Sequence, residues 1–333
     1  MTPGGIKRIS TLFRPKSSKD SKPGRSKLQP LPDSPESPSP TPPFSSSSAT
    51  STFSRPGTAG STTTTRRKKD KDKRHEEDLL GPASPLDEFA QPLTDRVVVV
   101  SGASRGIGLE FVKQLSQDPH TLVIALIRNP ETAAKLVQLT STQVVAIHAD
   151  VTDEASLRAA ASDVSKLAKG KVDMLINCAA VNTDPDKTLE EWDAEGLNLH
   201  LATNVTGPVL TTNAFLPLLR HSSQKPKKII NLTSGMASLT LNSPANPPSP
   251  SYAAYTISKC CLNAATRKYA VELGREGMLF VALSAGWVRT DMGGPDAPLS
   301  AQEAVSQLLR VIEGLKQEDN GKFLHINGEE IDF

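Results

Sequence analysis

From Arg96 onward the chain alternates short apolar runs with longer stretches of helical periodicity, and this alternation limits the folds open to it. The central runs are apolar at every position, so the strands they form must be covered on both faces. Strands that are separated by helical segments predict right-handed crossovers and a parallel sheet. We predict seven strands: Val97–Val100, Thr121–Leu126, Val144–His148, Val172–Ile176, Lys228–Leu232, Leu279–Leu283 and Lys322–Ile326.

Helical segments fill the gaps between these runs. A parallel sheet that is apolar on both sides needs helices on both faces, so the pattern predicts a single doubly wound α/β domain of the Rossmann type with about seven strands. We assign residues 93–333 to this domain. The predicted helices are Gly106–Gln117, Glu131–Leu139, Glu154–Ala168, Glu195–Arg220, Tyr252–Glu276 and Ala301–Gly314.

Residues 1–92 differ in composition from the rest of the chain. They hold 14 of the 26 prolines together with runs such as Ser45–Ser48, and they lack apolar periodicity. Such a segment cannot bury enough apolar surface to offset the entropy lost on ordering. We therefore predict a disordered, Ser/Thr/Pro-rich extension before the folded domain.

This extension is basic, with 16 Lys and Arg against 10 Asp and Glu, whereas the remainder has 22 against 26. Its positive charge could attract nucleic acid, an anionic membrane or an import receptor, but a solvated linker explains it without a partner. We therefore predict no required nucleic acid. No apolar run reaches the length of about 18 residues that a membrane span needs. We place the protein in the cytoplasm, in preference to mitochondrial or nuclear targeting, because Pro3 and Pro15 interrupt any amphipathic leader helix.

The chain has three cysteines, Cys178, Cys260 and Cys261. Three are too few for a disulfide framework, and adjacent cysteines on a helix point to different faces. We expect reduced thiols and no metal site.

A glycine turn, Ser101–Gly108, follows the first predicted strand with the spacing G-x-x-x-G-x-G. Gly102 allows a tight turn, Gly106 lets the backbone approach a phosphate, and Gly108 lets the helix pack against the strand. The N-terminus of the next helix offers free N–H groups and a positive dipole end to a pyrophosphate. Glycines also serve ordinary turns, so the triplet gains its meaning from this position. The predicted cofactor contacts here are Gly102, Ser104, Arg105, Gly106, Ile107 and Gly108.

This spacing resembles that of the short-chain dehydrogenase/reductase family, and the resemblance extends over residues 95–333. Asp150, after the third strand, is similar to the family's adenine-contacting Asp. Asn177 opens a segment similar to the Asn-Asn-Ala-Gly motif, in which Cys178 and Ala180 replace the second Asn and the Gly. The resemblance implies that Asp150 and Asn177 contact the cofactor.

The end of the second strand indicates which dinucleotide is bound. An acidic side chain there would bond the ribose of NAD and repel a 2′-phosphate, but Ala125–Arg128 contains none. Arg128 and Arg105 could instead hold a 2′-phosphate by charge-assisted hydrogen bonds. Either Arg alone would pass as a surface residue, but the two together favour NADP(H).

Tyr255 and Lys259 form a Tyr-x-x-x-Lys motif, which on a helix places both side chains on one face. Carbonyl reduction needs a proton delivered to oxygen, and a phenol with its ordinary pKa of about 10 is a poor acid at neutral pH. A neighbouring ammonium favours the phenolate, so we expect Lys259 to lower the pKa of Tyr255. Tyr252 lies on a similar helical face but lacks such a Lys, and we expect it to form part of the pocket wall.

The family resemblance implies a role for each member of a catalytic tetrad. Tyr255 would protonate the carbonyl oxygen, and Lys259 would also bond the nicotinamide ribose. Ser234, which closes the fifth strand, would orient the substrate oxygen. Asn204 would hold a water in a proton relay.

Two later segments border the predicted site. Ser284–Gly294 resembles the family's Pro-Gly-x-x-x-Thr segment with Ala285 in place of Pro, which implies that the Val288 backbone and the Thr290 hydroxyl hold the carboxamide. The proline-rich segment Leu239–Ser251 is an insertion relative to the family. It either shapes substrate choice at the pocket mouth or is a neutral surface excursion.

These features predict an NADP(H)-dependent oxidoreductase that reduces a ketone, an aldehyde or a quinone, or oxidises the corresponding alcohol. The substrate would be a small apolar carbonyl or alcohol. The alternative is a non-catalytic NADP-sensing or scaffold module that acts through the basic tail, although such a module would not need Tyr255 and Lys259 together.

Oligomers of this fold are built on the long helix pair, so we expect a homodimer. Three segments are similar to C-factor and sniffer-type carbonyl reductases: Gly108–Val112, Gly286–Gly294 and Gly321–Ile331.

Overall fold

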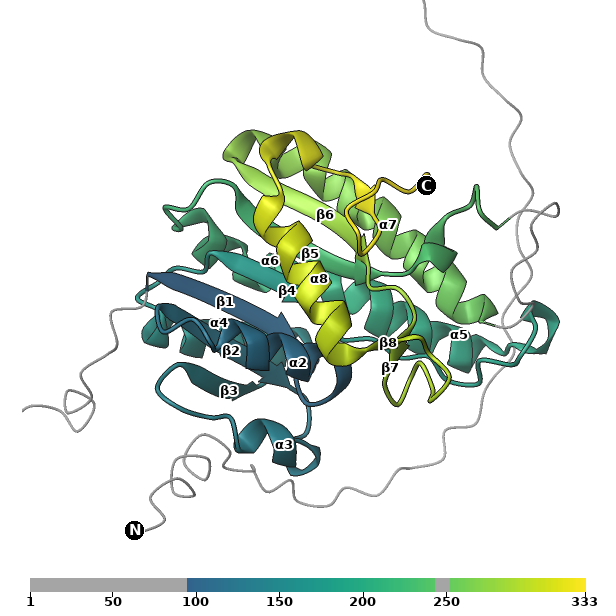
Figure 1. Ribbon diagram of the computed structural model, residues 1–333, viewed down its shortest axis with the longest axis horizontal. Helices are drawn as coiled ribbons and strands as arrows, with labels where there is room; N and C mark the ends of the chain where they lie inside the picture. The colour runs from purple at the N-terminus through teal and green to yellow at the C-terminus, as the bar shows by residue number, and fades with distance from the viewer. Residues whose placement is uncertain (1–94, 243–251) are drawn as a thin grey trace, which may run out of the picture. The chain divides into compact units, whose positions relative to one another are not determined.

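The computed structural model describes residues 95–242 and 252–333 (Figure 1). The predicted tail and most of the Leu239–Ser251 insertion lie outside these residues. Within them, seven parallel strands form one sheet in the order β3-β2-β1-β4-β5-β6-β9. The predicted α/β fold is therefore confirmed. The strands are β1 (Arg96–Ser101), β2 (Thr121–Ile127), β3 (Val144–His148), β4 (Met174–Asn177), β5 (Lys227–Thr233), β6 (Met278–Ser284) and β9 (Phe323–Leu324).

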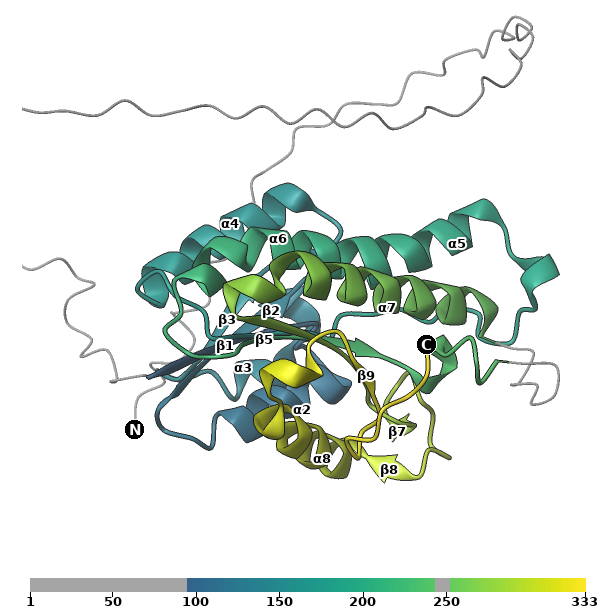
Figure 2. The same cartoon turned by 90° about the horizontal axis from the view of Figure 1, so that it is seen from above.

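Helices cover both faces of this sheet, as Figure 2 shows from above. One face carries α2 (Gly106–Leu115), α3 (Ala134–Val137) and α8 (Ala301–Gly314). The other face carries α4 (Glu154–Leu167), α5 (Ala194–Leu201), α6 (Gly207–Arg220) and α7 (Ala253–Leu273). Both faces are needed because side chains on successive residues of a strand point to opposite sides.

The core follows this alternation along the first strand. Val98 and Val100 pack with α2 and α8, whereas Val97 and Val99 pack on the opposite side with α4 and α6. All four valines are essentially inaccessible to solvent. Burial of each such side chain contributes about 1.5–3 kcal/mol, so this central strand anchors both layers.

The order of the strands determines where a ligand can bind. From β1 the chain moves outward to β2 and β3, and then returns to the other side of β1 with β4. In a doubly wound sheet, the loops at such a reversal diverge and leave a crevice beyond the carboxyl ends of the strands. The glycine turn predicted from the sequence lies at this point.

Beyond differences at the ends of strands and helices, the predicted helix Glu131–Leu139 is reduced to a 3₁₀ turn, Pro130–Thr132, and the single turn α3. Two further features differ from the predicted elements. The predicted helix Glu195–Arg220 is divided into α5 and α6 by a π-helical turn, Ala202–Thr206. A short parallel pair, β7 (Val288–Arg289) with β8 (Leu299–Ser300), lies after β6 and was not predicted. Both lie next to the carboxyl edge of the sheet, beside the candidate site.

Candidate active site

The loop between β1 and α2 has a backbone that requires glycine. Gly102 and Gly106 have φ angles of 66° and 56°, in the left-handed region that favours glycine. A Cβ atom on Gly102 would lie 2.6 Å from the Cα atom of Ala179, and one on Gly108 would lie 2.3 Å from the carbonyl oxygen of Gly102. Gly108 thus permits close packing of the helix on the loop itself, rather than on a strand as the sequence predicted.

This loop delivers the N-terminus of α2 to the crevice. Arg105 is the N-cap residue of α2, and its side chain makes no capping hydrogen bond. The first-turn N–H groups are therefore available to an anion, and the helix dipole favours negative charge at the same point.

A cavity of 1390 Å³ extends from this loop across the carboxyl edge of the sheet. It exceeds the roughly 300–1000 Å³ typical of pockets for drug-sized ligands, so it can accommodate a dinucleotide together with a substrate. The structure brings most of the predicted site residues to its wall. They are Gly102, Ser104, Arg105, Gly106, Ile107, Gly108, Arg128, Asp150, Ser234, Tyr255, Lys259, Val288 and Thr290.

Asn177 lies beneath the wall of this cavity and is not among the residues that line it, and its expected contact with the cofactor stays a prediction. Its side chain is 2% exposed and donates to the Thr212 hydroxyl at 3.2 Å and to the Asn231 carboxamide oxygen at 2.8 Å. Asn231 in turn donates to the Thr266 hydroxyl. The Asn177 side chain therefore joins β4 to β5 and α6 beneath the site.

Asn204 is also buried beneath the cavity wall, in the π-helical turn. Its carboxamide oxygen accepts from the Val181 N–H at 2.8 Å, and its Nδ2 atom donates to the Val181 carbonyl and to the Ser258 hydroxyl. The side chain fixes the Val181 loop to α7, and the expectation that it holds a water stays a prediction. The turn remains a notable position, because single π-helical turns occur frequently at functional sites.

The end of β2 is basic. Arg128 is exposed and lines the cavity, and Lys135, at the start of α3, lines it as well. The sequence indicated Arg128 from its position at the strand end, but it gave no signal for Lys135, which folding brings to the same region. Asp150, at the end of β3, accepts from the Thr152 N–H and hydroxyl through one carboxylate oxygen.

Tyr255 and Lys259 lie one turn apart near the start of α7. The Lys259 Nζ atom is 5.5 Å from the centroid of the Tyr255 ring and donates to the Leu232 carbonyl oxygen at 2.8 Å. Ser234 follows β5 and accepts from the Met236 N–H. A phenol, an ammonium group and a hydroxyl are thus placed at the wall of one cavity.

Burial controls the ionisation of this group of residues. It raises the pKa of Tyr255 above its ordinary value, and it lowers the pKa of Lys259 to about 8. Burial also raises the pKa of the Cys178 thiol to about 12, and the nearby Lys259 opposes that rise. The Tyr255 pKa therefore shifts in the direction opposite to the expected one, because burial raises it and the nearby Cys178 adds to the rise.

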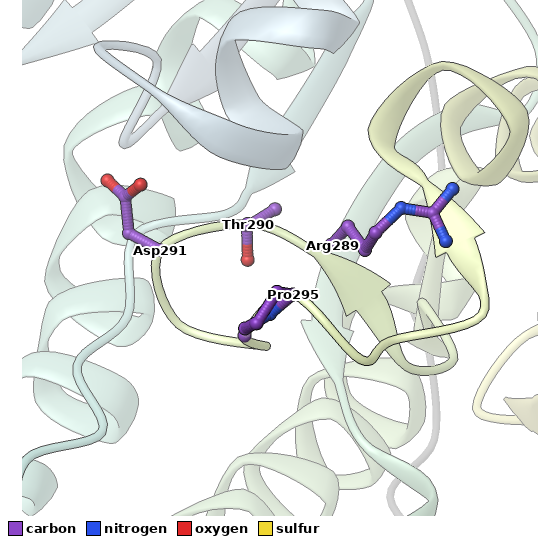
Figure 3. A pocket seen from close by; sticks show the side chains of 5 residues that line it. Arg289, Thr290, Asp291 and Pro295 are labelled. Atoms are coloured by element: carbon purple, nitrogen blue, oxygen red, sulfur yellow. The ribbon is translucent and has the colours of Figure 1, made fainter.

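The segment after β6 closes the far side of the cavity. Val288 and Thr290 lie on its wall, and the Thr290 hydroxyl accepts from the Gly293 N–H at 3.1 Å. The Thr290 methyl group lies 3.4 Å from the position of a Cβ atom on Gly106. The glycine loop and the Val288–Gly294 segment therefore lie close together. A second hollow, of 340 Å³, lies on this segment between Arg289 and Pro295 (Figure 3).

Several cavity residues were not predicted as ligands. Trp287 and Met292 remain 56% and 44% exposed, and with Met236 they give the cavity an apolar border. Tyr252 lines the cavity as expected, but it precedes α7 with a φ angle of 71° and so is not on the helical face proposed for it. Cys178, which was not predicted to border the site, lines the cavity too. These placements arise from tertiary folding and leave no periodic signal in the sequence.

The short chain dehydrogenase family profile matches residues 96–298. The chain therefore belongs to the short-chain dehydrogenase family and is an oxidoreductase, which confirms the resemblance noted in its motifs. The C-signal protein of Myxococcus xanthus is 40% identical over 162 residues, which span 49% of this chain and 93% of that protein.

Two solved structures extend the similarity. The carbonyl reductase Sniffer of Drosophila melanogaster has a TM-score of 0.66 at 28% identity, covering 72% of this chain and 100% of that one. The NADPH-bound carbonyl reductase from chicken fatty liver has a TM-score of 0.66 at 32% identity, covering 72% and 95%. In residues 95–242 and 252–333, no helix is long and apolar enough to cross a membrane.

Proposed function

We propose that this chain is an NADP(H)-dependent carbonyl reductase that acts on a small apolar ketone, aldehyde or quinone, or on the corresponding alcohol. The observation that carries the proposal is that Tyr255, Lys259 and Ser234 share one cavity with the glycine loop. A proton donor and a dinucleotide site are the two parts that carbonyl reduction requires.

The cavity suits a phosphorylated dinucleotide. Gly102 and Gly108 leave no room for a Cβ atom within the protein, so the glycine loop packs closely against α2 and Ala179 and presents the N-terminus of α2 to a pyrophosphate. Arg105, Arg128 and Lys135 supply positive charge for a 2′-phosphate. The related chicken carbonyl reductase binds NADPH, which supports the same choice here.

The reaction would proceed with proton transfer from Tyr255. The glycine loop and Lys259 would hold NADPH, which would supply a hydride for the carbonyl carbon. Ser234 donates a hydrogen bond to the carbonyl oxygen and orients it toward the Tyr255 hydroxyl, which gives up its proton as charge develops on that oxygen. Lys259, held by the Leu232 carbonyl, stabilises the phenolate that remains. Asn204 keeps the cavity wall in place through Val181.

The oxidation of NADPH by the purified chain, measured with a panel of diketones, quinones and aldehydes, tests this proposal. Tyr255→Phe should lose at least 100-fold in kcat/KM, since general acid catalysis contributes roughly 10²–10⁴-fold. Tyr269→Phe is a matched control on the same helix, because the Tyr269 hydroxyl donates to Asn213 away from the cavity. Full activity of Tyr255→Phe would refute the assignment.

A further inference from the structure

An ion pair crosses one end of the cavity. The Arg105 Nη1 atom lies 3.3 Å from the Asp291 Oδ2 atom, and both residues line the cavity wall. Arg105 belongs to the glycine loop before α2, whereas Asp291 belongs to the segment after β7. The pair therefore joins the two sides of the candidate cofactor site.

Asp291 has no other charged partner among the described residues. Figure 3 shows that its carboxylate and the Arg289 guanidinium point away from each other on the loop. Arg289 uses its Nη1 atom on the carbonyl oxygens of Ala297 and Pro298, at 2.6 and 3.0 Å. Arg105 is thus the one cation within reach of Asp291 in the part of the chain that the structure describes.

The pair is well placed to change partners. Its side chains are 77% and 76% exposed, and water screens exposed ion pairs strongly. A phosphate group can form a bidentate, charge-assisted contact with the Arg105 guanidinium, which is stronger than the single contact with Asp291. A carboxylate next to that phosphate would also be repelled by it. A 2′-phosphate would therefore displace Asp291 from Arg105.

We propose that Asp291 determines cofactor specificity by competing with the 2′-phosphate of NADP for Arg105, which weakens the binding of NADP more than that of NAD. This inference rests on the proposed NADP site. It also makes the Asp291 loop responsive to the cofactor, since loss of the ion pair frees that loop from the glycine turn.

The turn that follows Asp291 is tight, and Thr290 closes it by accepting from the Gly293 and Gly294 N–H groups through its hydroxyl and its carbonyl. Gly294 has a φ angle of 76°, and a Cβ atom on Gly293 would lie 2.1 Å from the Val288 carbonyl oxygen. The Trp287 indole N–H donates to the Gly293 carbonyl at 2.7 Å. Trp287 therefore reports on this turn, and its fluorescence should change when the ion pair is exchanged.

The test compares the Kd values of NADP⁺ and NAD⁺, measured by isothermal titration calorimetry, for the full chain and its variants. Asp291→Asn should lower the Kd of NADP⁺ about two- to five-fold, the range expected for loss of an exposed ion pair. The Kd of NAD⁺ should change by less than about 1.5-fold, because NAD lacks the competing phosphate. Asp296→Asn, on the same loop but without an ion pair to any described residue, should change neither.

Arg105→Gln provides the second arm. In this background Asp291→Asn should have no further effect on NADP⁺ binding, because the competed guanidinium is gone. An unchanged or raised Kd for NADP⁺ in Asp291→Asn overturns the inference while leaving the NADP site intact, and so does an equal gain in the Arg105→Gln background. Failure of the unaltered chain to bind NADP⁺ overturns the proposed function itself.

Trp287 fluorescence gives a separate readout, measured in a Trp192→Phe background so that one indole remains. Saturating NADP⁺ should change its emission more than saturating NAD⁺, and Asp291→Asn should reduce this difference. Equal responses to the two cofactors would contradict the coupling between Arg105 and the loop.

Discussion

Gly108 offers a sharp test of the packing that forms the candidate cofactor site. Gly→Ala stabilises the interior of a helix by about 0.8–1 kcal/mol, and this value is an upper bound at Gly108, which lies in the first turn of α2. Here the new methyl group would lie 2.3 Å from the Gly102 carbonyl oxygen, whereas ordinary contacts begin at 3.4 Å. The loop and helix must therefore separate by about 1 Å, and overpacking of this kind costs roughly 1–3 kcal/mol. We expect the steric cost of Gly108→Ala to exceed the gain in helix propensity, so that the substitution destabilises the fold by up to about 2 kcal/mol.

The same displacement should affect function more than stability. It moves the first-turn N–H groups of α2 relative to Tyr255, and misplacement by 1 Å can cost on the order of 10²-fold in rate. Chemical denaturation and kcat/KM for NADPH measure the two effects. Gly314→Ala is the matched control, because Gly314 ends α8 with no atom within 4 Å of its Cβ position. If the Gly108 and Gly314 variants proved equally stable and active, the steric reasoning would be refuted.

Three further predictions concern ionisation, capping and the core. Burial lowers the pKa of Lys259 to about 8 from its ordinary value of 10.5. Between these two pH values the unfolded chain binds more protons at Lys259 than the folded chain does. The contribution of Lys259 to the free energy of unfolding therefore rises with pH. From pH 8 to pH 10.5, the free energy of unfolding of the unaltered chain should therefore rise by about 3 kcal/mol relative to that of Lys259→Met. Parallel curves of unfolding free energy against pH for the two proteins would contradict this. Ser300 forms a capping box with Glu303 at the start of α8, so Ser300→Ala should cost about 1 kcal/mol in thermal unfolding. Phe280 is fully buried in β6 and stacks on Tyr269 at 5.1 Å, so Phe280→Ala should cost about 3–5 kcal/mol in denaturant, and a loss below 1 kcal/mol would contradict its place in the core.

The strands could be predicted well because burial on both faces leaves an unbroken apolar run. β3 has the predicted bounds, and β5 and β6 extend one residue beyond theirs at each end. β9 is shorter than predicted because it pairs with only Ala282 and Leu283 before the chain turns. The π-helical turn at Ala202–Thr206 was not predicted from the helical periodicity of Glu195–Arg220.

Side-chain directions and burial at the candidate site could not be predicted from the sequence. Motifs gave the positions of Asn177 and Asn204 but not the directions of their side chains, and both point into buried hydrogen-bond networks. Lys135 and Trp287 reach the cavity only through tertiary folding, so their spacing in the sequence carried no signal. The pKa of Tyr255 was predicted in the wrong direction because an ammonium neighbour can be inferred from spacing, whereas the extent of burial cannot.

The corrected pKa values bear on how Tyr255 could act. A raised pKa keeps the phenol protonated at neutral pH, and carbonyl reduction needs the protonated form. Hydride transfer turns the carbonyl oxygen into an alkoxide, which is a much stronger base than a phenolate. A phenol whose acidity is lowered by burial can therefore still protonate it. Lys259 is largely charged below pH 8 and would stabilise the phenolate only after the proton has left. Burial would therefore hold the proton on Tyr255 until charge develops on a substrate oxygen, which favours general acid catalysis over ionisation of Tyr255 in advance.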